Sequence, residues 1–256
     1  MTSLLTFMKK DLSEQVRSGK LLLLLIIFTL FGIMNPAIAK MTPWLLEVMS
    51  ESLEQSGMTI APVNVTAMDS WVQFFKNIPM ALIVFALMQG GAVTGEYKSG
   101  TLILSLTKGL DRYKVVVSKS CLLLGLWSVL YWMCFGITYL YNAYFWDNSI
   151  AKNLGFSAIC WWIFGIFIIS LMILSSTASG SFSGVLLITG GTVFTSFLLG
   201  ALPGIKDYMP TSLTDGTSLI FDKLQPSDYI PCLTITLVLT LICFGASFPI
   251  FNKKQL

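Results

Sequence analysis

The run LLLLLIIFTLFGIMNPAIA, Leu21–Ala39, contains no Asp, Glu, Lys, Arg or His. An α-helix needs roughly 20 such apolar residues to cross the hydrocarbon core of a bilayer. A cleavable signal peptide has a shorter apolar region that starts nearer the N-terminus. The run therefore predicts a retained membrane-spanning helix.

Five further runs have the same character: Asn77–Thr94, Ser120–Tyr141, Phe156–Leu174, Val185–Leu202 and Ile230–Ile250. The second span extends back to Trp71 if Lys76 reaches the interface with its ammonium group, because long cationic side chains can snorkel. The expected spans are thus 21–39, 71–94, 120–141, 156–174, 185–202 and 230–250. Together they predict an all-α, polytopic membrane protein with six transmembrane helices in a single domain, 1–256.

Composition supports this class. The 256 residues are 55% hydrophobic and 11% charged, and the mean hydropathy is +0.76, whereas soluble domains carry about 25% charged residues. A net charge of +3 is too small to indicate a nucleic-acid partner. The five cysteines all fall in apolar runs, and none forms a CxxC pair, which favours buried thiols over a metal or redox site.

Lys and Arg residues gather in alternate flanks of the spans, and this asymmetry predicts orientation. Basic residues mark the N-terminal segment, the loop 95–119 and the C-terminus, whereas the segments 40–70 and 203–229 hold most of the acids. We expect both termini and loop 95–119 in the cytoplasm, with 40–70 and 203–229 as outer loops. An even number of spans agrees with two basic termini.

The segments outside the spans carry their own patterns. Residues 4–19 place Leu5, Met8, Leu12 and Val16 at helical spacing, which predicts an amphipathic helix in the membrane interface; a disordered tail is the alternative. In the outer loop 40–70, a short helix around Trp44–Gln55 is expected, and Asn35-Pro36 marks either a kink or the outer end of the first span. Three prolines prevent 203–229 from forming one helix, so a folded cap or short re-entrant pieces are expected there.

Catalysis by this chain is not expected. The sequence contains no histidine and no GxxxxGK[ST] loop, so it lacks the commonest general base and the usual phosphate cradle. The spans lack the intramembrane ionisable residues that ion-driven transporters use. No cofactor or metal is predicted, and any energy for transport must come from a partner protein.

The loop after the second span has an unusual layout. Glu96 stands at its start, Ser99-Gly100-Thr101 follows, and Leu102, Ile103, Leu104 and Leu106 form an apolar stretch on the water side of the membrane. An acid at a helix N-terminus is stabilised by the helix dipole. A short helix with excess apolar surface would suit a protein partner, although it could equally lie against the bilayer or the chain's own spans.

This motif, Glu96…Gly100-Thr101 with Lys108 and Arg112 downstream, resembles the E-x-x-x-G-T signature of ABC-2 type permeases, the membrane subunits of bacterial ABC exporters. The resemblance extends to the layout of the whole chain. It implies that the loop is a coupling element docking on a separate ATPase subunit, formed here by Glu96, Tyr97, Gly100, Thr101, Leu102, Leu104 and Leu106. Two copies of that ATPase, which would hold the ATP and Mg²⁺, and a second permease, identical or paralogous, are the implied partners, besides membrane lipid.

The expected function is export of a hydrophobic or amphipathic substrate, such as a peptide, across the bacterial cytoplasmic membrane. The alternative from another class is a non-transporting membrane scaffold or assembly factor. Small residues on the fifth span suggest a dimer seam or pathway near Gly191, Val193, Ser196 and Gly200, because small side chains let helices approach closely. The pair Gly90-Gly91 favours helix packing over a flexible gate for the same reason.

Overall fold

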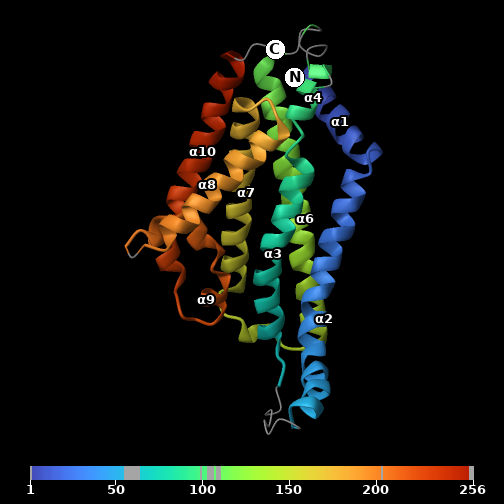
Figure 1. Cartoon of the computed structure of the whole chain (residues 1–256), viewed down its shortest axis with the longest axis vertical. Helices are drawn as coiled ribbons and strands as arrows, with labels where there is room; N and C mark the ends of the chain where they lie inside the picture. The colour runs from blue at the N-terminus through green and yellow to red at the C-terminus, as the bar shows by residue number, and fades with distance from the viewer. Residues whose placement is uncertain are drawn as a thin grey trace.

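Six long helices run through the computed structural model (Figure 1), which describes residues 2–54, 64–98, 100–102, 107, 111–202 and 204–253. They are α2 (Lys20–Glu54), α3 (Ala67–Gln89), α6 (Arg112–Phe145), α7 (Leu154–Ala178), α8 (Phe182–Gly200) and α10 (Ile230–Lys253). All six are long and apolar enough to cross a membrane, and no strand occurs among the described residues. The predicted fold class, an all-α polytopic membrane protein, is confirmed.

The helices form two connected groups. The first group packs α2, α3 and α6 together; the second pairs α7 with α10, and α7 also contacts α6 and α8. Helix α7 is the most buried of the six spans and α8 the least. Two large aromatic side chains, Trp127 and Tyr131, are fully buried on α6, and Trp127 donates a hydrogen bond to the carbonyl of Trp162 on α7. Helix α6 therefore joins the two groups.

The two ends of the bundle differ in charge. Helix α1 (Thr2–Arg17), α4 (Thr94–Lys98), the start of α6 and the end of α10 lie at the end drawn uppermost in Figure 1. We call it the basic end, because Lys9, Lys10, Arg17, Lys114 and Lys119 belong to these elements. The opposite, acidic end carries Asp147, Asp215, Asp222 and Asp228. Both termini thus approach the same end, as six spans require.

Helix α2 is longer than the expected first span. It passes through Pro36 and Pro43 without ending and continues to Glu54, so Asn35-Pro36 is not its outer end and the short helix expected around Trp44–Gln55 is a continuation of α2. A proline lacks the N–H that would bond the carbonyl four residues earlier. For Pro36 that carbonyl belongs to Gly32, and Thr138 Oγ1 on α6 donates to it at 2.9 Å. A neighbouring helix therefore replaces the lost bond.

A short series of hydrogen bonds between α3, α2 and α6 lies beside the bond from Thr138 to Gly32. The Asn77 amide on α3 donates to Asn35 Oδ1 at 2.8 Å, and the Asn35 amide donates to Thr138 Oγ1 at 3.2 Å. Gly32 makes the approach possible, because a Cβ there would lie 3.0 Å from Ile137 Cβ. The first helix group is thus held together by interhelical hydrogen bonds as well as by packing.

The helix of the second span is interrupted near its end. Helix α3 ends at Gln89, and a turn over residues 90–93 separates it from α4. Gly90 is right-handed, with φ −59°, and a Cβ on it would lie 2.9 Å from the Ala86 carbonyl oxygen and 3.1 Å from the Phe182 ring. Close packing explains Gly90 without a flexible gate.

The segment before α10, which we call the cap, does not form one helix, as its prolines predict. It contains the short helices η2 (Lys206–Tyr208), η3 (Pro210–Thr214), α9 (Gly216–Ile220) and η4 (Pro226–Tyr229). Trp161 on α7 donates to the Thr214 carbonyl at 2.9 Å, and Tyr229 donates to the Asp215 carbonyl at 2.8 Å. The cap is therefore held by one hydrogen bond to α7 and by one between its own residues.

Candidate functional site

Helix α1 presents three different faces. Leu5, Leu12 and Val16 are exposed, whereas Phe7, Asp11 and Gln15 are buried against the bundle. Lys10 and Arg17, seven positions apart, share a third face, and the Lys10 ammonium lies 4.9 Å from the centroid of the buried Phe7 ring. The predicted amphipathic helix forms, and its apolar stripe is free to meet lipid. The unexpected feature is the protein-facing stripe, which contains an acid and an amide.

The loop acid Glu96 is buried. It lies in the first turn of α4 with 6% of its surface exposed, so the coupling element predicted from the sequence does not offer this carboxylate to a partner. A buried carboxylate is costly unless a cation accompanies it. Two lysines do so here.

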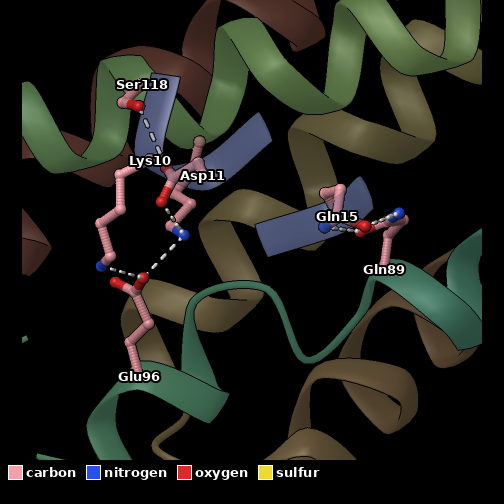
Figure 2. A network of polar contacts seen from close by, with 7 residues as sticks. Lys10, Asp11, Gln15, Gln89, Glu96 and Ser118 are labelled. Carbon is pink, nitrogen blue, oxygen red and sulfur yellow. Dashed lines mark hydrogen bonds and ion pairs between the residues drawn. The ribbon is translucent and has the colours of Figure 1, made fainter. Parts of the chain in front are cut away.

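The carboxylates and lysines form one compact group at the basic end (Figure 2), which we call the charge cluster: Lys10, Asp11, Glu96, Ser118 and Lys119. The Lys119 ammonium lies 2.9 Å from Asp11 Oδ1 and 3.0 Å from Glu96 Oε1. Lys10 approaches Glu96 Oε1 at 3.2 Å. The two lysines thus offset the charges of the two buried acids, Asp11 and Glu96.

Asp11 is the most deeply placed acid of the cluster. Only 2% of it is exposed, and Ser118 donates to its Oδ2 at 3.1 Å. Burial raises the pKa of the Asp11 carboxyl, while the adjacent Lys119 opposes the rise. Although Asp11, Glu14 and Glu96 are close enough to share a cation, the Lys119 ammonium already occupies the position between two of them. The group is therefore better suited to an ion-pair network than to a metal.

A second polar contact fixes the other end of α1. The side-chain amides of Gln15 and Gln89 each donate to the oxygen of the other, at 3.0 and 3.1 Å, and both residues are buried. Gln89 is the last residue of α3, directly before the turn that leads to Glu96. Helix α1 thus holds both the end of α3 and the start of the loop (Figure 2).

The base of the loop also contacts the C-terminal helix. Arg112 donates to the carbonyl oxygens of Phe251 and Asn252 at 3.3 and 2.9 Å, and the Tyr97 ring lies 6.1 Å from that of Phe251. Elements from four regions, α1, α4, α6 and α10, therefore meet where the loop leaves the bundle.

The remaining predicted loop residues have different environments. Gly100 adopts φ +69°, a left-handed conformation that glycine tolerates best. Thr101 is exposed, whereas Leu102 is fully buried in the core and so adds nothing to an exposed apolar surface. Leu104 and Leu106 lie outside the described residues.

The structure separates the four residues predicted for a dimer seam on α8. Gly191 is exposed, with nothing within 4 Å of an added Cβ. Val193 packs on the core, and Ser196 and Gly200 approach Thr211 of the cap. The face that α8 leaves uncovered carries Leu187, Phe194 and Leu198, and Gly191 shares it by helical spacing.

Sequence reasoning identified Glu96 but missed Asp11, Gln15 and Lys119 as its neighbours. A signal was present, because Phe7, Asp11 and Gln15 recur every four residues and so share a helix face. Amphipathic patterns are usually judged by their apolar stripe, and here the stripe that contacts the protein is the polar one.

A family model of known proteins matches most of the chain. Residues 5–233 fit the model of the ABC-2 family transporter proteins, while a search of curated proteins returns no match. The matched region includes most of α1, the charge cluster and five complete spans. In that family the membrane component works with a separate ATPase subunit. The chain therefore belongs to the ABC-2 family of transporter proteins, as a multi-pass membrane permease.

Proposed function

We propose that the chain is the transmembrane subunit of an ATP-driven exporter, and that the charge cluster carries motion from the ATPase into the spans. The observation that supports this is the position of Glu96. It belongs to the loop that the family resemblance assigns to the ATPase, yet it is bound to α1 and α6 through Lys119. A push on the loop would move both helices together.

The proposed motion follows from the buried polar contacts that join these helices to one another. Lys119 binds two acids at once and is itself buried, and the Gln15–Gln89 amide pair joins α1 to α3. Packed elements shift as units because interiors are close-packed. Closure of the ATPases would therefore tilt α1, α3 and α6 together and open the route toward the acidic end.

The direct test uses the chain together with an ABC ATPase that forms a complex with it. Reconstituted vesicles containing both subunits should accumulate or release a hydrophobic or amphipathic probe, such as a labelled peptide, only with ATP and Mg²⁺. The rival function, a scaffold without transport, predicts a complex that assembles and shows no ATP-dependent movement of any probe. An ATPase variant that binds but does not hydrolyse ATP is the matched control.

The substrate class rests on the character of the spans. Their middle sections carry amides, hydroxyls and apolar side chains, with no carboxylate. A route of that kind suits cargo that is apolar or amphipathic, because a strongly charged cargo would lose its hydration without compensation. Export of a peptide fits this description.

A second permease completes the route in this proposal. Helix α8 is the least buried span, and Leu187, Phe194 and Leu198 are uncovered on it. We place the subunit seam along this face rather than at Val193. Cysteines at 194 or 198 should cross-link between subunits in a cysteine-free background, and Val193→Cys should not; the reverse pattern would move the seam back to Val193.

Orientation is testable with two exposed tyrosines on one helix. Tyr113 and Tyr144 lie at opposite ends of α6 and are 51% and 82% exposed. Because basic flanks favour the cytoplasm, an impermeant maleimide added to intact bacterial cells should label Tyr144→Cys and leave Tyr113→Cys unlabelled until the cells are opened. Labelling of residue 113 in intact cells would reverse the assignment.

A further inference from the structure

We propose that the groove between α2 and α6 at the acidic end binds one anionic phospholipid, with its phosphate at Lys40. The groove has a volume of about 260 Å³ and is lined by Ile33, Pro36, Ala37, Met41, Tyr141 and Phe145, with Lys40 beside them. It lies far from the charge cluster and has no part in the coupling described above.

The shape of the groove follows from its residues. Gly32 brings α2 and α6 into close contact, and the groove opens just beyond that contact. Ala37 supplies only a methyl group between the larger Ile33 and Met41. The resulting wall is apolar, which suits an acyl chain and gives little to a water-soluble ligand.

Lys40 provides the complementary charge. Its ammonium lies 3.6 Å from the centroid of the Phe145 ring, which places it over one wall of the groove. Among the described residues, the structure gives Lys40 this cation–π contact and no carboxylate partner. A lysine at the end of an apolar groove is positioned for a phosphate oxygen.

The depth of Lys40 agrees with a lipid headgroup. It follows Lys20 by 20 positions along the continuous helix α2. At 1.5 Å per residue this separation is about 30 Å, the thickness of the hydrocarbon core. Exposed Trp44 and Tyr144 lie near this level, as expected of the aromatic belt at a membrane interface.

Native mass spectrometry can count the lipids that stay bound. The permease would be released from bilayers of equimolar phosphatidylglycerol and phosphatidylcholine, and the ratio of the two retained lipids measured. We expect the parent to retain phosphatidylglycerol preferentially and Lys40→Gln to lower that ratio about fivefold. Lys40→Arg should keep the preference, and Lys76→Gln, which removes an exposed lysine that does not line the groove, should leave it unchanged.

A second variant tests the groove itself. Ala37→Phe should fill it and lower the amount of retained phosphatidylglycerol while the protein keeps its oligomeric state. The proposal is overturned if Lys40→Gln retains the parental lipid ratio. It is equally overturned if Ala37→Phe leaves lipid binding intact and dissociates the permease, because the groove would then be a seam between subunits.

Discussion

Glu96 and Lys119 are 23 positions apart in the sequence, and their side chains meet at 3.0 Å. Glu96 begins the loop after the second span and Lys119 lies in the first part of α6, so this ion pair closes the loop at its base. A loop that is closed in this way moves with the helices on either side of it. The pair is therefore the structural reason to expect that force on the loop reaches the spans.

Glu96→Gln should lower both stability and export. Without the carboxylate, the buried Lys119 keeps only Asp11 as an ion-pair partner, and Lys10, whose side chain is 44% exposed, loses Glu96. Breaking a buried ion pair costs about 3–5 kcal/mol, so unfolding in detergent should shift clearly, and ATP hydrolysis should become less coupled to substrate efflux. Both are measured on the reconstituted complex.

Asp111→Asn is the matched control for that experiment. Asp111 also pairs with a lysine, Lys114, at 2.6 Å, but its side chain is 55% exposed. Removing a charge at such a surface site changes stability by no more than about 0.5 kcal/mol. Equal effects of the two substitutions on export would contradict the role given to the base of the loop.

The amide pair Gln15–Gln89 gives a second test of how α1 is held. Gln15→Ala or Gln89→Ala leaves one buried amide without its partner, at a cost of about 1–3 kcal/mol. Replacing both with Leu removes the need for a partner and should restore most of the lost stability. Thermal unfolding of the two single variants and the double variant measures this, and additive losses would show that the amides do not act as a pair.

The spans were predictable because every segment that crosses the bilayer must satisfy its backbone hydrogen bonds without water. A helix of sufficient apolar length is the simplest way to satisfy the backbone in hydrocarbon, and each of the six predicted runs overlaps an observed helix that is long and apolar enough to span. The cap over 203–229 was predictable for a similar reason, since proline acts locally. Each of these inferences needed only the residues of the segment concerned.

The sequence could not reveal features that depend on distant partners. Helix α2 continues past Pro36 because Thr138 donates a hydrogen bond to the Gly32 carbonyl, which the proline leaves without a backbone donor. Thr138 and Gly32 are 106 positions apart in the sequence. The Glu96 motif was recognisable, but its burial depends on Asp11 and Lys119, which are 108 positions apart. The four seam residues were chosen for their size, and the structure exposes Gly191 while Val193 packs on the core and Ser196 and Gly200 approach the cap.

The stabilisation from the hydrogen bond between Thr138 Oγ1 and the Gly32 carbonyl should depend on whether residue 36 is proline. Thr138→Val removes the donor and leaves the Gly32 carbonyl unpaired in the parent. In Pro36→Ala the new N–H can serve that carbonyl, so the same substitution should cost less, by about 0.6–1.7 kcal/mol. Unfolding of the four proteins of this double-mutant cycle in mixed micelles gives the difference, and an equal cost in both backgrounds would refute the repair.

Two glycines on α7 offer a matched pair for the packing between the helix groups. A Cβ on Gly165 would lie 2.2 to 2.4 Å from atoms of the Trp127 indole, whereas a Cβ on Gly155 meets nothing within 4 Å. Trp127 is fully buried and donates a hydrogen bond to the Trp162 carbonyl at 3.1 Å, so its ring cannot move aside without losing that bond. Gly165→Ala should therefore destabilise the protein.

Overpacking of this kind costs about 1–3 kcal/mol, whereas Gly155→Ala should be neutral or slightly stabilising, because alanine favours the helix over glycine by about 1 kcal/mol. Thermal unfolding separates the two variants, and near-ultraviolet circular dichroism reports whether the Trp127 environment changes. The contact between α6 and α7 joins the group that carries the charge cluster to the group that carries the cap. A Gly165→Ala variant that is as stable as Gly155→Ala would mean that this contact is loose, and the two groups would then be free to move independently during transport.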